Sequence, residues 1–485
     1  MRRLFLVLPL AASLAACGGA QQPRDAPIAV SVIGNGLAAA DPSAGPLGMP
    51  ARVLLDSTAQ GLVRFDGASQ IEPGLAASWA VTPDGRSYIF RLRDAAWQDG
   101  EPVTAEQVAR VLRRAAASGS RNPLAPFLQV VDEIVAMTPQ VIEVRLKSPR
   151  PDLLKLFAQP ELAIFRDGGG TGPFVAQPGR PDGLLLQPMR DPAGPADEEA
   201  AKPDPRGRVW VRSGRAALAI ARFKAGHSEL VLGGTFADWP IVGVAAVPQE
   251  NIRIDSAAGL FGLAVTERDG FLADPANRAA LAMALDRAAL TALFRPDWQP
   301  AETVLPLQLD SAAAPAVPAW APLPLDARRE NARARVREWQ RAHPGPVTVR
   351  IALPPGPGAT LVWGSLMVSL RTIGVEPVRA EFSQAADLRL IDAVAPYDSA
   401  RWFLAMACRL CSSDAAAAIA AARDAPDLAS RAQRIAEADA LLTADSAYIP
   451  IAQPFRWSIV SARLTGWQGN TRAWHPLNHL RNESE

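Results

Sequence analysis

Hydrophobic positions early in the chain repeat with the period of a β-strand. Residues 88–92 (YIFRL) place Tyr88 and Phe90 on one face and an arginine on the other, and this period of two predicts a strand with one buried face. A Pro-Asp-Gly turn signal occupies residues 83–85. Residues 79–81 are therefore predicted to be the partner strand of a hairpin.

The residues directly downstream change to a helical period. Residues 104–107 (TAEQ) fit a capping box, in which Thr104 accepts a hydrogen bond from the amide of Gln107 and the Gln107 side chain reaches back. The apolar positions that follow lie three or four residues apart: Val108, Val111, Leu112 and Ala115. The unit is predicted to be a hairpin, a tight turn and an amphipathic helix. It holds no nucleophile beside a base, so we interpret it as scaffold.

The same signals predict further elements in the second half of the chain. Asp274 before Pro275 is an N-cap followed by proline at the first helical position. Apolar residues at every seventh position from 428 to 442 predict a packed helix, and residues 448–452 a strand after it. The arginine-rich residues 326–341 contain two glutamates, which favours a solvated helix face.

Glycine and proline mark the irregular segments. Residues 168–172 (GGGTG) lack the Lys-Ser/Thr ending of a phosphate loop, so we expect a chain reversal with positive φ there. The proline-rich residues 188–206 are predicted to be a surface loop, and residues 305–325 an irregular excursion.

The N-terminus has the features of an export signal. Residues 1–17 (MRRLFLVLPLAASLAAC) begin with two arginines, and the apolar stretch at 4–16 is shorter than the roughly 20 residues that cross a bilayer. The ending Leu-Ala-Ala-Cys resembles a bacterial lipobox, which predicts lipidation of Cys17; the alternative is an ordinary signal peptide cut nearby. Residues 18–27 are predicted to be a flexible tether.

The composition and net charge limit the kinds of binding partner that the protein is expected to have. The 485 residues are 49% hydrophobic and 20% charged, which is typical of a globular chain with two or three domains. The formal net charge of +1 gives no basic excess of the kind that nucleic-acid binders carry. We therefore expect no nucleic-acid partner.

A series of different short motifs is spread over most of the chain. They are residues 74–79 (GLAASW), 84–85 (DG), 90–94 (FRLRD), 97–100 (WQDG), 103–108 (VTAEQV), 170–174 (GTGPF), 277–287 (NRAALAMALDR), 445–451 (DSAYIPI) and 465–466 (TG). In this order they resemble the motifs of the family 5 extracellular solute-binding proteins, the peptide- and nickel-type receptors of ABC importers.

The resemblance implies an α/β fold with two lobes, a periplasmic-binding-protein-like fold of type II and similar to cluster C. An extra subdomain would be inserted in the first lobe. The implied first lobe comprises residues 28–49, 165–258 and 455–485, and the inserted subdomain comprises residues 50–164. The second lobe would be residues 259–454.

The resemblance also implies where a ligand would bind. Receptors of this kind hold a peptide's amino terminus on an acidic side chain of the second lobe, which here implies Asp392 or Asp398, with Tyr397 and Trp402 available for stacking. The usual Trp-x-x-Asp-Tyr-x-x-Pro-like run of peptide receptors is missing, which weakens a peptide assignment. The alternative is that these four are strand-end and turn residues that never meet a ligand.

Cysteine and histidine give little sign of a metal or cofactor. Cys408 and Cys411 could form a disulfide in an oxidising compartment, whereas one Cys-x-x-Cys is too few for a zinc site. His475 and His479 are four apart, but Pro476 between them disfavours a shared helical face. We expect neither a metal nor a cofactor.

Two hypotheses for function follow. The first is an exported, lipid-anchored, monomeric receptor on the periplasmic or extracytoplasmic face that passes a peptide-like solute to an ABC permease. The second is a lipoprotein of the same fold that has lost solute capture and serves as an interaction or sensory component. An enzyme is disfavoured, because the sequence has no GxSxG, no HExxH and no carboxylate pair at a telling spacing.

Overall fold

The computed structural model describes residues 26–166, 169–179, 182–189, 207–307 and 309–481. The predicted signal peptide with Cys17, nearly all of the predicted tether and most of the predicted loop at 188–206 lie outside the described residues.

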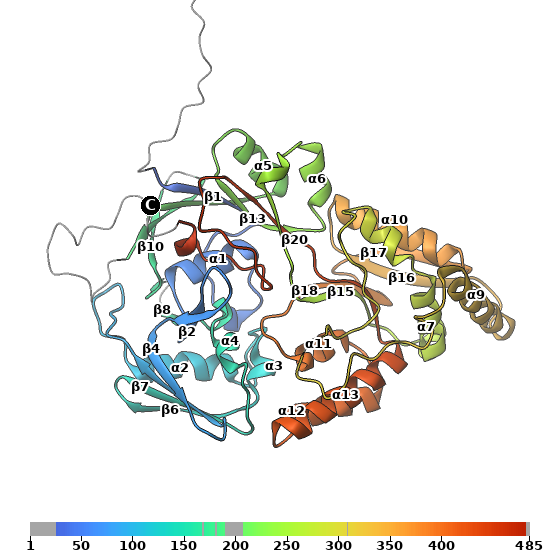
Figure 1. The fold of residues 1–485 in the computed structure, drawn as a ribbon, viewed down its shortest axis with the longest axis horizontal. Helices are drawn as coiled ribbons and strands as arrows, with labels where there is room; N and C mark the ends of the chain where they lie inside the picture. Colours follow the sequence, from blue (N-terminus) through green and yellow to red (C-terminus); the bar gives the residue numbers. More distant parts are fainter. Residues whose placement is uncertain (1–25, 167–168, 180–181, 190–206, 308, 482–485) are drawn as a thin grey trace, which may run out of the picture.

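A seven-stranded mixed sheet forms the centre of the first lobe (Figure 1). Its spatial order is β10-β11-β12-β1-β13-β20-β14. The bounds are β1 Ile28–Ile33, β10 Phe174–Pro178, β11 Leu184–Pro188, β12 Val209–Gly214, β13 Leu230–Thr235, β14 Ile252–Asp255 and β20 Arg456–Val460. Strand β1 is parallel to both neighbours and buried along nearly its whole length, as a central strand covered on both faces requires.

A five-stranded sheet forms the centre of the second lobe, in the order β17-β16-β18-β15-β19. Its strands are β15 Gly259–Val265, β16 Val347–Leu353, β17 Val375–Glu381, β18 Leu388–Val394 and β19 Tyr448–Ala452. The strand predicted at 448–452 is confirmed. Among the described strands, the chain passes between the two large sheets at two links, β14 to β15 and β19 to β20.

A four-stranded antiparallel sheet, β4-β5-β7-β6, forms the subdomain beside the first lobe. Its strands are β4 Ala76–Val81, β5 Ser87–Leu92, β6 Val131–Thr138 and β7 Val141–Leu146. The predicted hairpin is confirmed, because Trp79 pairs with Phe90 and Val81 with Tyr88. The structure also describes two small two-stranded ribbons, β2 Val63–Phe65 with β3 Ile71–Pro73 and β8 Phe165–Arg166 with β9 Gly169–Gly170.

The described helices cover the sheets. Their bounds are α1 Met49–Thr58, α2 Ala105–Ala116, α3 Ala125–Leu128, α4 Leu153–Phe157, α5 Ala216–Lys224, α6 Trp239–Val244, α7 Pro275–Ala284, α8 Arg287–Ala292, α9 Leu325–Ala342, α10 Pro357–Arg371, α11 Ala400–Ala407, α12 Ser413–Asp424 and α13 Leu428–Asp445. Short 3-10 turns lie at Pro42–Ala44, Pro160–Leu162, Gln249–Asn251, Gly270–Ala273 and Leu477–His479.

Three predicted helices are confirmed: α7 with its Asp274 cap, the arginine-rich α9, and α13. Within the described part of the chain, none of the helices has both the length and the apolar character that a bilayer crossing demands.

The predicted capping box of α2 is confirmed and extends to the hairpin side. The Thr104 hydroxyl accepts from the Gln107 amide, and the Gln107 Oε1 accepts from the Thr104 amide at 3.0 Å. The same Oε1 also accepts from the Trp97 indole at 2.9 Å. One side chain therefore ties the turn after the hairpin to the start of the helix.

The glycine-rich segment differs from its prediction. Gly169, Gly170 and Gly172 all have ordinary negative or extended φ, so the prediction of positive φ is wrong for them. A Cβ on Gly170 would lie 2.6 Å from the Ala59 Cβ, and one on Gly172 would lie 2.5 Å from the Ala59 nitrogen. Glycine is needed because the segment packs directly on the end of α1.

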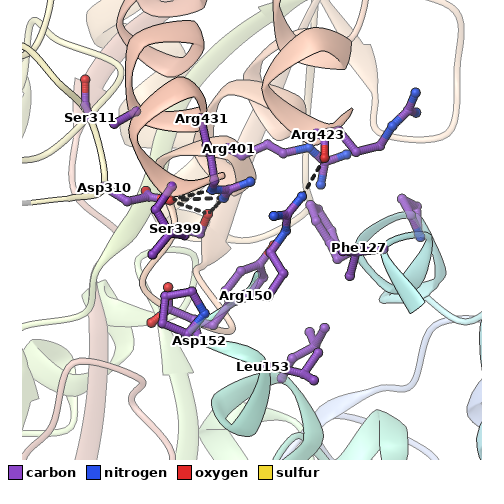
Figure 2. A pocket seen from close by; sticks show the side chains of 17 residues that line it. Phe127, Arg150, Asp152, Leu153, Asp310, Ser311, Ser399, Arg401, Arg423 and Arg431 are labelled. Carbon is purple, nitrogen blue, oxygen red and sulfur yellow. Dashed lines mark hydrogen bonds and ion pairs between the residues drawn. The ribbon is translucent and has the colours of Figure 1, made fainter. Parts of the chain in front are cut away.

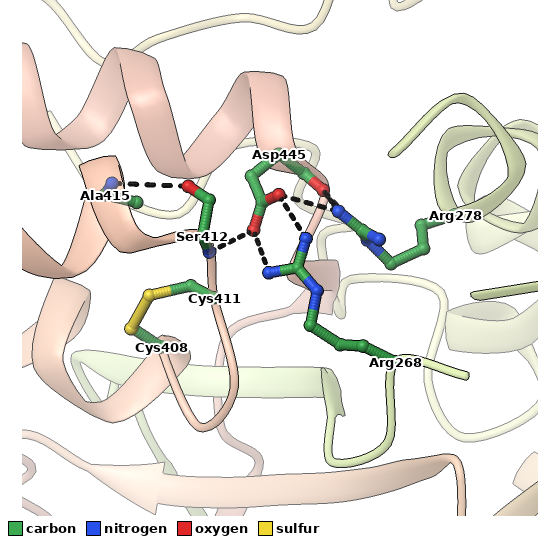
Figure 3. Close-up of a disulfide and its surroundings, with 7 residues drawn as sticks. All are labelled: Arg268, Arg278, Cys408, Cys411, Ser412, Ala415 and Asp445. Carbon is green, nitrogen blue, oxygen red and sulfur yellow. Dashed lines mark hydrogen bonds and ion pairs between the residues drawn. A yellow bond between two sulfur atoms is a disulfide. The ribbon is translucent and has the colours of Figure 1, made fainter. Parts of the chain in front are cut away.

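Two of the family-like motifs meet in a buried ion cluster (Figure 3). The fully buried Arg278 of α7 donates to the Asp445 carboxylate at 2.6 Å and also to its backbone carbonyl. Arg268 donates to the same carboxylate at 2.7 Å, and the Ser412 amide at 2.9 Å. The structure joins Cys408 and Cys411 by a disulfide just before Ser412, whose hydroxyl caps α12.

Candidate ligand site between the lobes

Apolar contact runs from one lobe to the other. The Phe236 ring of the first lobe packs against Phe261 of β15 with centroids 4.9 Å apart. The Phe127 ring of the subdomain meets Tyr397 of the second lobe at 5.8 Å. The lobes are thus in contact, and two cavities lie along their junction.

The inner cavity lies where the chain crosses between the lobes and measures about 470 Å³. Its lining comes from α1, the end of β13, β14, β18, β20 and the C-terminal segment: Leu47, Met49, Arg52, Gly233, Gly234, Thr235, Asp255, Asp392, Val394, Arg456, Trp457, Ser458, Arg472, Ala473, Trp474 and His475. Both lobes therefore contribute walls.

Several charged groups of the inner cavity are paired with one another. Asp392 at the end of β18 accepts from Arg456 at 2.7 Å. Burial raises the pKa of Asp392, and Arg456 opposes that rise. His475 lies 3.1 Å from the Asp255 carboxylate. The predicted ligand carboxylate Asp392 is thus in the cavity wall with a protein partner already in place.

Asp398 joins the two lobes. Its two carboxylate oxygens pair with Lys155 of α4 and with Arg472. Partial burial alone would raise the pKa of Asp398, but the hydrogen bonds and charges of Lys155 and Arg472 lower it below its usual value. The Gln159 amide also donates to the Pro396 carbonyl at 2.5 Å across the same junction. These contacts therefore link the second lobe to the subdomain and to the C-terminal segment.

The outer cavity lies between the subdomain and the second lobe and measures about 290 Å³ (Figure 2). The subdomain lines it with residues on and around α3 and α4: Pro126, Phe127, Val130, Arg150, Pro151, Asp152, Leu153 and Leu156. The second lobe lines it from the segment before α9 and from α11 to α13: Asp310, Ser311, Tyr397, Ser399, Arg401, Arg423, Leu428, Arg431 and Ala432.

The two predicted aromatic residues have different places. Tyr397 is buried in the wall of the outer cavity, and burial raises its pKa to about 12. Trp402 of α11 is 4% exposed and packs edge-on against Phe403. Trp402 lines neither of these two cavities, so we leave it out of the candidate site.

The histidines near the C-terminus lie apart in separate contacts. His475 faces Asp255, whereas the His479 Nε2 lies 3.0 Å from the Glu72 Oε1. Among the described residues no group of three or more His, Cys, Asp or Glu side chains is arranged to hold a metal ion.

The two cavities between the lobes are thus each lined from both sides of the junction. A sequence model of the bacterial extracellular solute-binding proteins, family 5 (middle region), matches residues 70–338, more than half of the 485 residues. The chain belongs to this family.

Two curated relatives of the family 5 chain match only locally. The periplasmic oligopeptide-binding protein OppA of Haemophilus influenzae is 37% identical over 82 residues, which is 17% of this chain and 15% of the relative. The probable deoxycholate-binding periplasmic protein YgiS of Escherichia coli is 38% identical over 79 residues, 16% of this chain and 15% of the relative. The matched segments thus span about 15% of each relative's length.

Solved structures match over nearly the whole family 5 chain. Haemophilus influenzae OppA in complex with RPPGFSPFR has a TM-score of 0.76 at 18% identity, covering 93% of this chain and 98% of that chain. The murein tripeptide binding protein MppA of Escherichia coli has a TM-score of 0.78 at 17% identity, with the same two coverages. The two-lobe α/β fold predicted from the motifs is therefore confirmed.

Sequence reasoning missed most of the outer cavity. Arg150 lies in a Pro-Arg-Pro loop and Arg401 in the first turn of α11, and neither belongs to a periodic or spaced pattern. The segment from Asp392 to Asp398 is the signal in the sequence that points to the junction.

Proposed function

We propose that this family 5 protein captures a solute between its lobes and delivers it to the permease of an ABC importer. The observation that carries the proposal is that both cavities are lined from both sides of the junction. A ligand held by both lobes contributes contacts that only the closed form offers, so binding and closure are coupled. No bond needs to be made or broken.

The solute class is proposed from the relatives and the lining together. The matched proteins are named for an oligopeptide, deoxycholate and, in NikZ of Campylobacter jejuni, Ni(L-His). The described cavities combine apolar walls with charged side chains. We propose a small peptide or a similarly sized amphipathic molecule as the solute.

The proposed location is the periplasm, with the protein held to a membrane by a lipid on Cys17. The relatives' names place them in the periplasm, and the Leu-Ala-Ala-Cys ending of residues 1–17 supports lipidation. A monomer suffices for this role.

One observation favours the alternative of a receptor fold that no longer captures solute. Asp392 and Asp398, the carboxylates expected to hold an ammonium group, are paired with Arg456, Lys155 and Arg472. In that case the closed form would persist without a ligand, and the protein would act as an interaction or sensory component.

A retention experiment separates the two roles. The purified protein is incubated with a peptide pool, and retained molecules are identified by native mass spectrometry while X-ray scattering follows its radius of gyration. Solute capture predicts defined retained species and a change in compactness. A double variant that fills both cavities, Val394→Trp in the inner one and Ala432→Trp in the outer one, should lose retention, whereas Val378→Trp on the exposed side of β17 should keep it. An unchanged, empty protein would support the alternative.

A further inference from the structure

Four arginines line the outer cavity, but two of them are neutralised by neighbouring carboxylates. Arg431 pairs with Asp310 at 3.0 Å. Arg423 forms a bidentate ion pair with Asp424, with both hydrogen bonds at 2.7 Å. These two cations therefore need no further anion.

Arg150 and Arg401 have no such partner. Arg150 donates to the backbone carbonyls of Pro149 and Arg423, which are neutral. For Arg401, no hydrogen bond to the described residues is formed, and its buried Nε is without a partner there. Its guanidinium lies over the Phe127 ring at 5.6 Å. Within the described chain, neither arginine lies within ion-pair distance of a carboxylate.

Burial makes this lack of a partner costly. Desolvation, together with the neighbouring charges of Arg431 and Arg401, lowers the pKa of Arg150 to about 10. Desolvation is also the main cause that lowers the pKa of Arg401. An anion placed between two desolvated cations that repel each other is bound more strongly than the same anion would be by two arginines in water.

The carboxylate of Asp152 does not fill this role. It is on the far side of the cavity from Arg401 in Figure 2, and burial raises its pKa to about 6. Three polar residues, Asp310, Ser311 and Ser399, also line the cavity, and two of them, Asp310 and Ser399, are already bonded to Arg431. The apolar part of the lining is Phe127, Val130, Leu153, Leu156 and Leu428. A ligand would therefore meet two cations at one end and hydrocarbon over most of its remaining surface.

From this arrangement we infer that the outer cavity binds the carboxylate of a small apolar acid between Arg150 and Arg401. A planar carboxylate matches the fork of a guanidinium and can bridge two of them. The apolar part fits against Phe127 and the leucines, within a cavity of about 290 Å³. This inference rests on the proposed solute capture and specifies the chemistry of the solute.

Calorimetry with the purified full chain tests the inference through three probes of one shape: 4-phenylbutyrate, 4-phenylbutan-1-ol and 4-phenylbutylamine. The acid should bind about tenfold or more tightly than the alcohol, and the amine should bind least, because only the acid forms charge-assisted bonds with both arginines. A second arm compares Ala-Ala-Phe with its C-terminal amide, which distinguishes a free acid from a peptide carboxylate. Equal affinity for acid and alcohol would overturn the inference.

Matched variants locate the site. Arg401→Gln and Arg150→Gln should each weaken 4-phenylbutyrate binding about tenfold, while alcohol binding is unchanged. Arg434→Gln, an exposed arginine of α13 that pairs with Glu437, should leave both affinities as they are. Acid binding that is indifferent to Arg401 and Arg150 would show that the anion binds elsewhere and would overturn the inference. Arg401→Lys, which keeps the charge, should retain part of the affinity even if a glutamine variant folds poorly.

The two proposals fail in different ways. If a peptide is retained and the lobes close while the acid does not bind, solute capture stands and the arginine site is wrong. If the acid binds through both arginines without a change in lobe separation, the arginine site stands and the clamp mechanism is wrong.

Discussion

At the scale of single residues, a buried carboxylate stabilises or destabilises the folded state depending on whether it has a charged partner. Asp439 of α13 is 2% exposed; its Oδ2 accepts from the Ala316 amide at 2.7 Å, while its Oδ1 has no partner in the described chain. Burial is the main cause that raises its pKa to about 6. The folded state therefore favours the protonated carboxyl. The stability that the protein has with Asp439 neutral is lost as the pH rises through about 6, because the buried side chain then becomes charged.

Asp439→Asn should consequently stabilise the protein at pH 7.5, because it removes a buried charge and can keep an acceptor for the Ala316 amide. The expected gain in the free energy of unfolding is about 2–3 kcal/mol, with little gain at pH 4, measured by urea unfolding. Glu437→Gln on the exposed face of the same helix is the control. A gain that does not depend on pH would contradict the argument.

Asp445 is the opposite case, because two arginines surround it. Asp445→Asn leaves the fully buried Arg278 without a counter-charge, and breaking a buried pair in this way costs about 3–5 kcal/mol. Thermal unfolding should show a large loss of stability. Asp297→Asn, at an exposed pair with Arg295, should cost less than about 1 kcal/mol. Similar losses for the two variants would disprove a special role for the cluster.

At the scale of elements, the Gln107 side chain links a turn to a helix. Gln107→Leu would leave the Thr104 amide and the Trp97 indole without their acceptor, at a cost of about 1–3 kcal/mol. Gln107→Glu keeps the oxygen that accepts both bonds and should cost much less. Hydrogen exchange at the first turn of α2 would report the difference, and equal exchange in both variants would rule out the link.

Local signals are what made such elements predictable. The alternation at residues 88–92 and the Thr104 cap depend on neighbours within four residues, so the sequence alone indicated them. Gly170 and Gly172 were misinterpreted because glycine is required there by close contact with Ala59, more than a hundred positions away in the sequence. Asp398 was predicted as a ligand residue, but its partners Lys155 and Arg472 lie 243 and 74 positions away.

At the scale of the whole molecule, the Lys155–Asp398 pair is a contact that opening of the lobes must break. Both side chains are about one-third exposed, 33% and 40%, so the pair is worth about 1 kcal/mol or less. Lys155→Gln should shift the closed-to-open ratio about fivefold or less toward the open form, seen as a larger radius of gyration in scattering without ligand.

The control for that shift is Lys147→Gln, since Lys147 donates to the Gln129 carbonyl within the subdomain. High salt should mimic Lys155→Gln in the natural chain. If the scattering of Lys155→Gln matches that of the natural chain at low salt, the pair does not hold the lobes together.

The resemblance indicated two lobes and an inserted subdomain, and the fold confirms this architecture. The exact boundaries at 49/50, 164/165, 258/259 and 454/455 stay predictions. Neither Arg150 nor Arg401 could have been connected from sequence, because the subdomain loop and α11 come together only when the lobes pack.

The two segments that connect the large sheets lie next to each other. Asp255 at the end of β14 is paired with Arg456 at the start of β20, and just beyond them Phe261 of β15 is paired with Ala452 of β19. The two covalent connections of the intervening stretch therefore lie next to each other, and its other contacts with the first lobe and the subdomain are non-covalent. Replacing this stretch with the equivalent stretch of a relative would exchange the cavity lining that the second lobe supplies. The rest of the chain would keep its sequence and its connections.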